Sequence, residues 1–227
     1  MGIDVGVLLS QTPILAGVSQ THLQALASRA EPRRFRVRDE IFGPGHHQQC
    51  WLIHQGRVRI GRVTRNREFF LRVARAGDLC GLEQLYGGHG QVRGVSLELA
   101  SAILLPTEAV VACLEDSPVL ATRLYAQTLA SQQLLLSRLD ELVSFNVPQR
   151  LMRFLLYLAE TYGSRRTDGG LLIDVGLSHQ DLAASVGTSR ETATTLLNDL
   201  KEAGLIDIGR RTLTVINAEG LRERLIN

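Results

Sequence analysis

Lysine is almost absent from this sequence, since Lys201 is the one lysine among its 25 basic residues. Excess charge is also lacking: the formal net charge is +2, and residues 148–227 hold ten basic and ten acidic residues. A polybasic coat is therefore excluded, and any affinity for nucleic acid must come from a local patch. Because arginine supplies nearly all the positive charge in this sequence, the abundance of arginine alone says little about recognition of nucleic acid.

Cysteines are few and scattered. Cys50, Cys80 and Cys113 are odd in number and show no CxxC spacing, which indicates buried or free thiols in a reducing compartment rather than a disulfide framework. No apolar run approaches the roughly 18 residues of a membrane helix, and no signal peptide opens the chain. We therefore expect a cytoplasmic protein without a membrane partner.

Three patterns divide the 227 residues. After a helix expected over residues 12–30, alternating runs of strand length broken by Gly, Pro or Asp turns continue to residue 114, without helical periodicity. They predict an antiparallel β sandwich or roll over residues 1–117. A long helical pattern follows over residues 118–147, started by Asp116-Ser117-Pro118, and residues 148–227 form a second domain. The expected class is α+β.

The long helical pattern has an apolar seam with alternating steps of three and four residues. Its members are Ala121, Tyr125, Thr128, Gln132, Leu135, Leu139 and Leu142. This spacing is typical of a parallel coiled coil, so we expect a dimerisation helix with Tyr125, Thr128, Leu135, Leu139 and Leu142 in the interface. The alternative is a helix that packs on its own domain.

Residues 177–206, LSHQDLAASVGTSRETATTLLNDLKEAGLI, contain two short helical patterns separated by a glycine-bearing turn. Ser178 and Asp181 have capping-box spacing, with Asp in place of Glu or Gln, and Gly187 permits the positive φ of a tight turn. LIDIGRRTLTVI follows and predicts two strands joined by a Gly-Arg-Arg turn. The pattern indicates a winged helix-turn-helix that binds double-stranded DNA.

The second helical pattern carries polar residues where a packing helix would be apolar. Ser189 can cap it, and Arg190, Glu191, Thr194 and Thr195 face outward near its start, where a recognition helix reaches base edges. Arginine can donate two hydrogen bonds to guanine, glutamate can accept from cytosine, and threonine can touch a thymine methyl. The alternative is an ordinary solvated helix start.

Other side chains around the motif are candidates for contacts to phosphate. They are Ser178, His179, Ser189, Thr194, Arg210 and Arg211.

Three segments carry a family resemblance: WLIHQGRVRIGRV, AGDLCGLEQLYGG and LSHQDLAASVGTSRETATTLL. Over essentially its full length the chain resembles the cyclic AMP receptor protein and FNR superfamily of bacterial regulators. The resemblance implies a cyclic-nucleotide-binding β-roll, a long dimerisation helix and a C-terminal winged helix-turn-helix. It also implies a homodimer on a pseudo-palindromic operator, with RNA polymerase as a further partner.

The same resemblance assigns base-reading roles. Arg190 and Glu191 match the family's guanine- and cytosine-reading pair in a TGTGA-like half-site. Thr195 stands where the family has a further arginine, so we expect one guanine preference to be relaxed.

The resemblance also locates an effector pocket, in which three of the four usual polar contacts are missing. The family's ribose-binding glutamate falls on Leu82 in Gly81-Leu82-Glu83, although Glu83 would fit after a shift of one residue. Arg93 matches the phosphate-binding arginine, but Gly94 replaces the Ser or Thr that follows it. The purine-contacting pair falls near Leu135 and Leu136. Because each lost hydrogen bond costs about 1–3 kcal/mol, cyclic AMP is disfavoured as the effector.

The same residues bear on effectors other than cyclic nucleotides. Leu82 also resembles the cyanobacterial nitrogen regulators, which sense 2-oxoglutarate, but the nearest residue to their second acid-binding arginine is Arg138, in a doubtful register. Arg93 has the alternative role of a structural ion pair. We therefore expect either an unidentified small-molecule effector or control without one.

Cofactor sensing and enzyme activity have little support. No cysteine cluster precedes Cys50 for an iron–sulfur sensor, and Cys80 has no histidine before His89 for haem. His46, His47 and His54 raise a cupin-like metal enzyme as an alternative, but adjacent His46 and His47 point in different directions and no carboxylate follows closely. We expect no cofactor, no metal and no catalytic residue.

Overall fold

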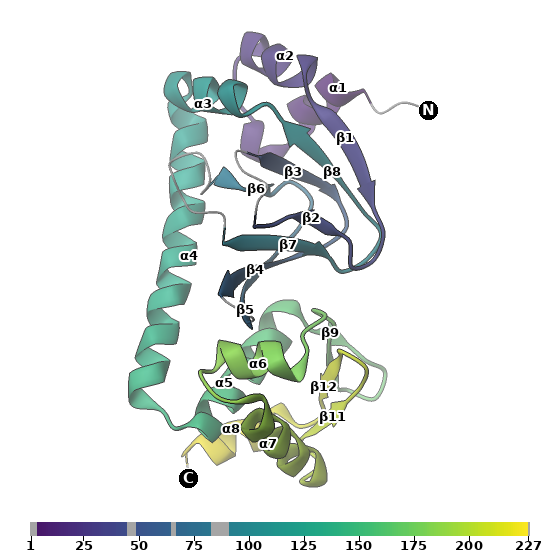
Figure 1. Cartoon of the computed structure of the whole chain (residues 1–227), viewed down its shortest axis with the longest axis vertical. Helices are drawn as coiled ribbons and strands as arrows, with labels where there is room; N and C mark the ends of the chain where they lie inside the picture. The colour runs from purple at the N-terminus through teal and green to yellow at the C-terminus, as the bar shows by residue number, and fades with distance from the viewer. Residues whose placement is uncertain (1–3, 45–48, 65–66, 83–90, 227) are drawn as a thin grey trace. The chain divides into compact units, whose positions relative to one another are not determined.

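The computed structural model describes residues 4–44, 49–64, 67–82 and 91–226 (Figure 1). The chain divides into two compact units, the first comprising Met1–Gly61 and Arg72–Leu135, the second Arg62–Leu71 and Leu136–Asn227. A short segment from the middle of the chain, residues 62–71, thus belongs to the C-terminal unit. Among the described residues, no helix is both long and apolar enough to span a bilayer.

The N-terminal strands form the predicted antiparallel roll. Two four-stranded sheets have the orders β1-β8-β3-β6 and β2-β7-β4-β5. Their strands are β1 (Glu31–Phe35), β2 (Glu40–Phe42), β3 (Cys50–Gln55), β4 (Val58–Thr64), β5 (Arg67–Ala74), β6 (Leu79–Cys80), β7 (Val92–Ser96) and β8 (Ala100–Leu105). The chain therefore has the expected α+β architecture, with β8 paired between β1 and β3.

Short helices pack on the roll, and two predictions about them are wrong. They are α1 (Val5–Gln11), η1 (Pro13–Leu15), α2 (Gln20–Ser28) and α3 (Thr107–Asp116). The helix expected over residues 12–30 is interrupted at Gly17, whose φ is +85°. The roll region also contains α3, in which Ala109, Val110 and Cys113 are buried. An apolar run of that length does not distinguish a strand from a helix.

The core of this unit joins the helices to one sheet. It includes Leu9, Leu26, Leu52, Leu105 and Leu120, each at most 2% exposed. Cys50, Cys80 and Cys113 are all buried, and none of them forms a disulfide.

The long helix α4 (Pro118–Ser144) begins where the sequence predicts, with the Ser117 hydroxyl accepting from the Leu120 amide at 3.4 Å. It ends three residues earlier than expected, because Asn146 starts a new helix, α5 (Val147–Tyr162). Asn146 and Gln149 form a reciprocal capping box, with side-chain-to-backbone distances of 3.0 and 3.1 Å. The break between the two helices is thus confined to residues 145 and 146.

The C-terminal part of the second unit is a winged helix-turn-helix (Figure 1). Its helices after α5 are α6 (His179–Ser185), α7 (Arg190–Glu202) and α8 (Ala218–Ile226). Its strands β9 (Ser164–Arg165), β10 (Leu171–Ile173), β11 (Ile206–Ile208) and β12 (Leu213–Val215) form a sheet of order β11-β12-β10-β9. The buried face of α5 includes Leu151, Phe154, Leu155, Leu158 and Ala159.

Candidate nucleic-acid interface

Helix α6 starts at the predicted capping box. The Ser178 hydroxyl accepts from the Asp181 amide at 3.2 Å, and the Asp181 carboxylate accepts from the Ser178 amide at 2.9 Å. Two otherwise free backbone N–H groups are satisfied, so the first helix of the motif has a fixed start. Leu182, Ala183 and Ala184 bury its inner face.

The turn between α6 and α7 depends on Gly187. Its φ is +69°, in the left-handed region that favours glycine. A Cβ at this position would lie 2.9 Å from Leu142 Cδ2, so the turn is also closely packed against the end of α4. Conformation and space therefore both favour glycine.

The recognition helix α7 separates a buried face from an exposed one. Ala193 and Leu197 are fully buried and Leu200 nearly so, whereas Arg190 and Glu191 are exposed at the first turn. The helix starts at Ser189, whose hydroxyl accepts from the Thr192 amide at 3.1 Å. The packing fixes the helix, and its first turn is left free to meet a ligand.

The electrostatics of this first turn favour an ionised Glu191. Hydrogen bonds from its own backbone amide and from the Ser189 side chain lower the pKa of Glu191, and the charges of Arg190 and Arg67 act in the same direction. Glu191 is therefore a hydrogen-bond acceptor near neutral pH, as reading a cytosine amino group requires.

Two threonines of α7 use their hydroxyl protons within the helix. Thr194 Oγ1 donates to the Arg190 carbonyl at 2.8 Å, and Thr195 Oγ1 donates to the Glu191 carbonyl at 3.2 Å. Thr195 is exposed. With the hydroxyl proton committed, its methyl group is what Thr195 offers for an apolar contact with a base.

The wing places two arginines at an exposed tip. Strands β11 and β12 pair from Ile206↔Val215 to Ile208↔Leu213, and the Gly209 amide donates to the Thr212 carbonyl at 2.9 Å to close the turn. Arg210 and Arg211 are exposed between them. The strands confirm the predicted wing.

Arg150, which the sequence reading did not select, joins the helix-turn-helix to the start of α5. Its Nε donates to the Val186 carbonyl at 2.8 Å and its Nη1 to the Phe145 carbonyl at 2.7 Å. The guanidinium therefore connects the turn that orients α7 to the break that follows α4. Nothing in the sequence separates this arginine from the other 23.

A second contact missed by the sequence reading comes from β5. The Phe70 amide donates to Ser185 Oγ at 3.2 Å, and the Phe70 ring centroid lies 6.0 Å from that of Phe154 and 5.7 Å from that of Tyr162. Phe70 thus packs on α5 and on the first helix of the motif. The sequence separation of 115 positions between Phe70 and Ser185 hides this contact from any local pattern.

Arg93 and Gly94, which the resemblance assigns to the effector pocket, each lie against another residue of the roll. Arg93 Nε lies 2.8 Å from a Glu40 carboxylate oxygen, so Arg93 forms the structural ion pair that is the alternative to phosphate binding. A Cβ on Gly94 would overlap the Phe42 ring, and Phe42 is fully buried. A serine or threonine after Arg93 would therefore require the core to rearrange.

The other implied pocket residues are distributed over different parts of the chain. Gly81 is buried with a φ of +86°, and Leu82 is half-buried. Leu135 and Leu136 are 50% and 52% exposed on α4. Glu83 lies outside the described residues, as do His46, His47 and His89 of the metal and haem alternatives. Among the residues that are described, no cluster of His, Cys, Asp or Glu could hold a metal ion.

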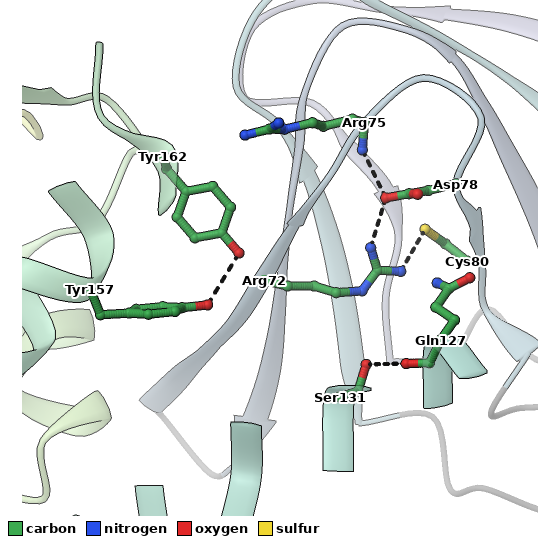
Figure 2. Close-up of polar contacts among 8 residues, drawn as sticks. All are labelled: Arg72, Arg75, Asp78, Cys80, Gln127, Ser131, Tyr157 and Tyr162. Atoms are coloured by element: carbon green, nitrogen blue, oxygen red, sulfur yellow. Dashed lines mark hydrogen bonds and ion pairs between the residues drawn. The ribbon is translucent and has the colours of Figure 1, made fainter. Parts of the chain in front are cut away.

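Cys80 is hydrogen bonded to an arginine of β5. Figure 2 shows the Arg72 guanidinium reaching both neighbours, with Nη1 3.0 Å from Asp78 Oδ2 and Nη2 3.6 Å from Cys80 Sγ. Asp78 also accepts from the Arg75 amide at 3.0 Å. These bonds fix the turn that precedes β6.

Arg138, the candidate acid-binding arginine, is engaged by its own unit. Its guanidinium carbon lies 4.7 and 4.6 Å from the ring centroids of Phe154 and Tyr157, and its Nη1 lies 2.8 Å from Glu141 Oε2. Arg138 therefore stabilises the packing of α4 on α5 and is not free to bind an acid.

Tyr157, one of the two rings under Arg138, is hydrogen bonded through its hydroxyl to the Tyr162 hydroxyl 3.4 Å away (Figure 2). Burial, and then this hydrogen bond, raise the pKa of Tyr157.

Comparison with known proteins agrees with this architecture. The Crp-like helix-turn-helix domain matches residues 149–224. The global nitrogen regulator of Synechococcus elongatus is 31% identical over 190 residues, covering 81% of this chain and 85% of that protein. The CRP-like cAMP-activated global transcriptional regulator of Mycobacterium tuberculosis is 24% identical over 220 residues, covering 96% and 98%. A solved CRP/FNR-family transcriptional regulator from Thermus thermophilus shares the fold, with a TM-score of 0.68, 24% identity and coverage of 87% and 99%.

Proposed function

Because the chain belongs to the Crp/Fnr superfamily of transcription regulators, we propose that it binds operator DNA as a homodimer, each protomer reading one TGTGA-like half-site. The observation that carries this proposal is the first turn of α7, where Arg190 and Glu191 are exposed above a fully buried inner face. The first residues of a recognition helix are the ones that reach base edges in the major groove.

The base contacts follow from the chemistry of the exposed side chains. Arg190 donates two hydrogen bonds to a guanine, Glu191 accepts from a cytosine amino group, and Thr195 offers its methyl to a thymine. Since Thr195 cannot make the bidentate contact of an arginine, the guanine preference at its base pair is relaxed.

Phosphate contacts would position the reader on the duplex without carrying sequence information. In this proposal they come from the start of α6, from the start of α7 and from the wing. The residues are His179, Ser189, Arg210 and Arg211, because the hydroxyl protons of Ser178 and Thr194 are already donated to Asp181 and to the Arg190 carbonyl.

The regulator's segments have separate roles in this proposal. Residues 1–117 form the sensor roll, 118–147 the dimerisation helix and 148–227 the DNA-binding domain, and RNA polymerase in the cytoplasm is a further partner. Cyclic nucleotide control is disfavoured because Arg93 is paired with Glu40 and the Phe42 ring leaves no room for a side chain on Gly94. The regulator then responds to an unidentified ligand or acts without one.

Selection of binding sites from random duplex DNA by the purified protein tests this proposal. We expect an inverted repeat with a GTGA-like core whose base preference is weak at the pair facing Thr195. Selections repeated with cyclic AMP, cyclic GMP and 2-oxoglutarate should recover the same sites at the same yield. A consensus without that core would contradict the reading assigned to Arg190 and Glu191, and strong dependence on either nucleotide would contradict the sensor assignment.

The dimer is expected to depend on the apolar stripe of α4. Tyr125, Leu135, Leu139 and Leu142 are between 46% and 65% exposed, which leaves a large apolar surface for a second copy of the helix. Leu139→Glu would place an unpaired carboxylate in that seam and should weaken dimerisation about a hundredfold or more. Light scattering after size-exclusion chromatography would measure the mass.

Val143 offers a matched control for this substitution. It is 89% exposed on the same helix but does not belong to the seam, so Val143→Glu adds the same charge and should leave the dimer intact. A Leu139→Glu variant that keeps twice the protomer mass at all concentrations would rule out this interface.

A further inference from the structure

His179 is hydrogen bonded across the helix-turn-helix to the recognition helix. Its Nδ1 lies 3.0 Å from Thr194 Oγ1. The same hydroxyl lies 2.8 Å from the Arg190 carbonyl oxygen, and a carbonyl can only accept. The single hydroxyl proton of Thr194 is therefore committed to Arg190, so His179 Nδ1 must be the donor in its bond to Thr194.

This arrangement fixes the tautomer of the neutral ring. With the proton on Nδ1, the other ring nitrogen, Nε2, carries a lone pair directed away from Thr194. His179 is half-buried at the first position of α6, so part of the ring remains accessible. A neutral His179 thus offers an acceptor at the place where a phosphate oxygen needs a donor.

Protonation would change Nε2 from a hydrogen-bond acceptor into a donor without moving the ring. The imidazolium keeps its Nδ1–H bond to Thr194 and gains an Nε2–H that can donate to a phosphate. Burial, and then the charge of Arg190, lower the pKa of His179 in the free protein, so the ring is neutral there near pH 7. A phosphate next to Nε2 would oppose both effects.

We propose that His179 is a proton-linked DNA contact, which takes up a proton when its Nε2 meets a DNA phosphate and so makes operator affinity depend on pH. The inference rests on the proposed function, because it requires α6 to lie against the DNA backbone. It adds a regulatory property to that function: the regulator binds its operator more tightly as the pH falls.

The sign follows from the two protonation states. The pKa of His179 is lower in free protein than in the complex, so binding takes up protons between these two values. The gain in affinity is complete below the free-state pKa and is lost as the pH rises through the bound-state pKa. With one His179 in each protomer, the dimer takes up at most two protons.

The other charged groups of α6 and of the first turn of α7 are Asp181, Arg190 and Glu191. On α6, the Asp181 carboxylate accepts from the Ser178 amide and hydroxyl at 2.9 and 2.8 Å. On α7, Arg190 acts on the ring through its charge, and Glu191 is held by its own amide and by Ser189. The DNA phosphate is thus the new charge that reaches the ring on binding.

The test is fluorescence anisotropy with a labelled duplex carrying inverted TGTGA and TCACA half-sites, at constant ionic strength between about pH 5.5 and about pH 8. We expect the wild-type protein to bind about tenfold or more tightly at the low end. His179→Gln, whose amide can still donate to Thr194 but cannot be protonated, should bind with nearly the same affinity at both ends of this range and so lose the gain.

His22→Gln is the matched control, since it removes a histidine that is paired with Asp116 at 3.2 Å in the first unit. It should keep the wild-type pH profile. Calorimetric titration of the same duplex in two buffers of different ionisation enthalpy should show proton uptake by the wild type and by His22→Gln, and less uptake by His179→Gln.

Two results separate this inference from the proposed function. If wild type and His179→Gln bind the duplex with the same pH profile and the same proton uptake, His179 is not the linked group and the proposed function is unaffected. If the wild type does not bind this duplex or the selected sites at any pH, the proposed function fails and the inference fails with it.

Discussion

Replacing Arg190 with alanine is expected to reduce affinity for the selected operator by about thirtyfold to about ten-thousandfold. A bidentate arginine–guanine contact contributes about 1–3 kcal/mol of discrimination, and a dimer loses two such contacts. Because Arg190 is exposed and bonds to the helix through its backbone carbonyl, the fold should be unchanged. Anisotropy with the operator and with a scrambled duplex would measure the loss.

Arg210 provides the contrast for this experiment. It is exposed at the tip of the wing and is proposed to contact phosphate, so Arg210→Ala should weaken both duplexes alike and reduce the salt dependence by about one counterion per contact. Equal losses on both duplexes for Arg190→Ala would show that Arg190 does not read bases.

Gly187→Val is expected to destabilise the DNA-binding domain by about 3–5 kcal/mol. Its φ of +69° is an outlier for a β-branched residue, and the new side chain must displace Leu142, whose Cδ2 lies 2.9 Å from the position of a Cβ. Thermal unfolding followed by circular dichroism would show an earlier transition, and operator binding should weaken with it.

Gly204 allows the effect of the positive φ to be separated from the effect of the contact with Leu142. It has the same φ of +69°, but a Cβ there meets nothing within 4 Å, so Gly204→Val should destabilise by only about 1–2 kcal/mol. Adding Leu142→Ala to Gly187→Val should recover the difference, with Leu142→Ala alone as reference. Equal effects of the two glycine substitutions would mean that contact with Leu142 contributes nothing.

The features that the sequence predicted well are those encoded locally. The capping box of Ser178 and Asp181, the turn at Gly187 and the two faces of α7 each depend on residues within one or two helical turns. Local hydrogen bonding and periodicity determine such elements almost by themselves.

The features that it missed depend on partners distant in sequence. Arg150 reaches Val186 and Phe70 reaches Ser185, and no spacing rule relates these pairs. Helix α3 was mistaken for strand because Val110, Val111 and Ala112 form an apolar run without periodicity of its own, and its burial is decided by α2 and the sheet. The crowding of Gly94 by Phe42 is likewise visible only in the folded roll.

The Leu142 side chain lies both in the stripe proposed for self-association and beside Gly187 in the turn before α7. This turn aims the recognition helix. If operator binding and self-association favour the same position of this side chain, each must strengthen the other by the same free energy. Cellular concentration of the protein would then set operator occupancy more steeply than independent protomers would allow.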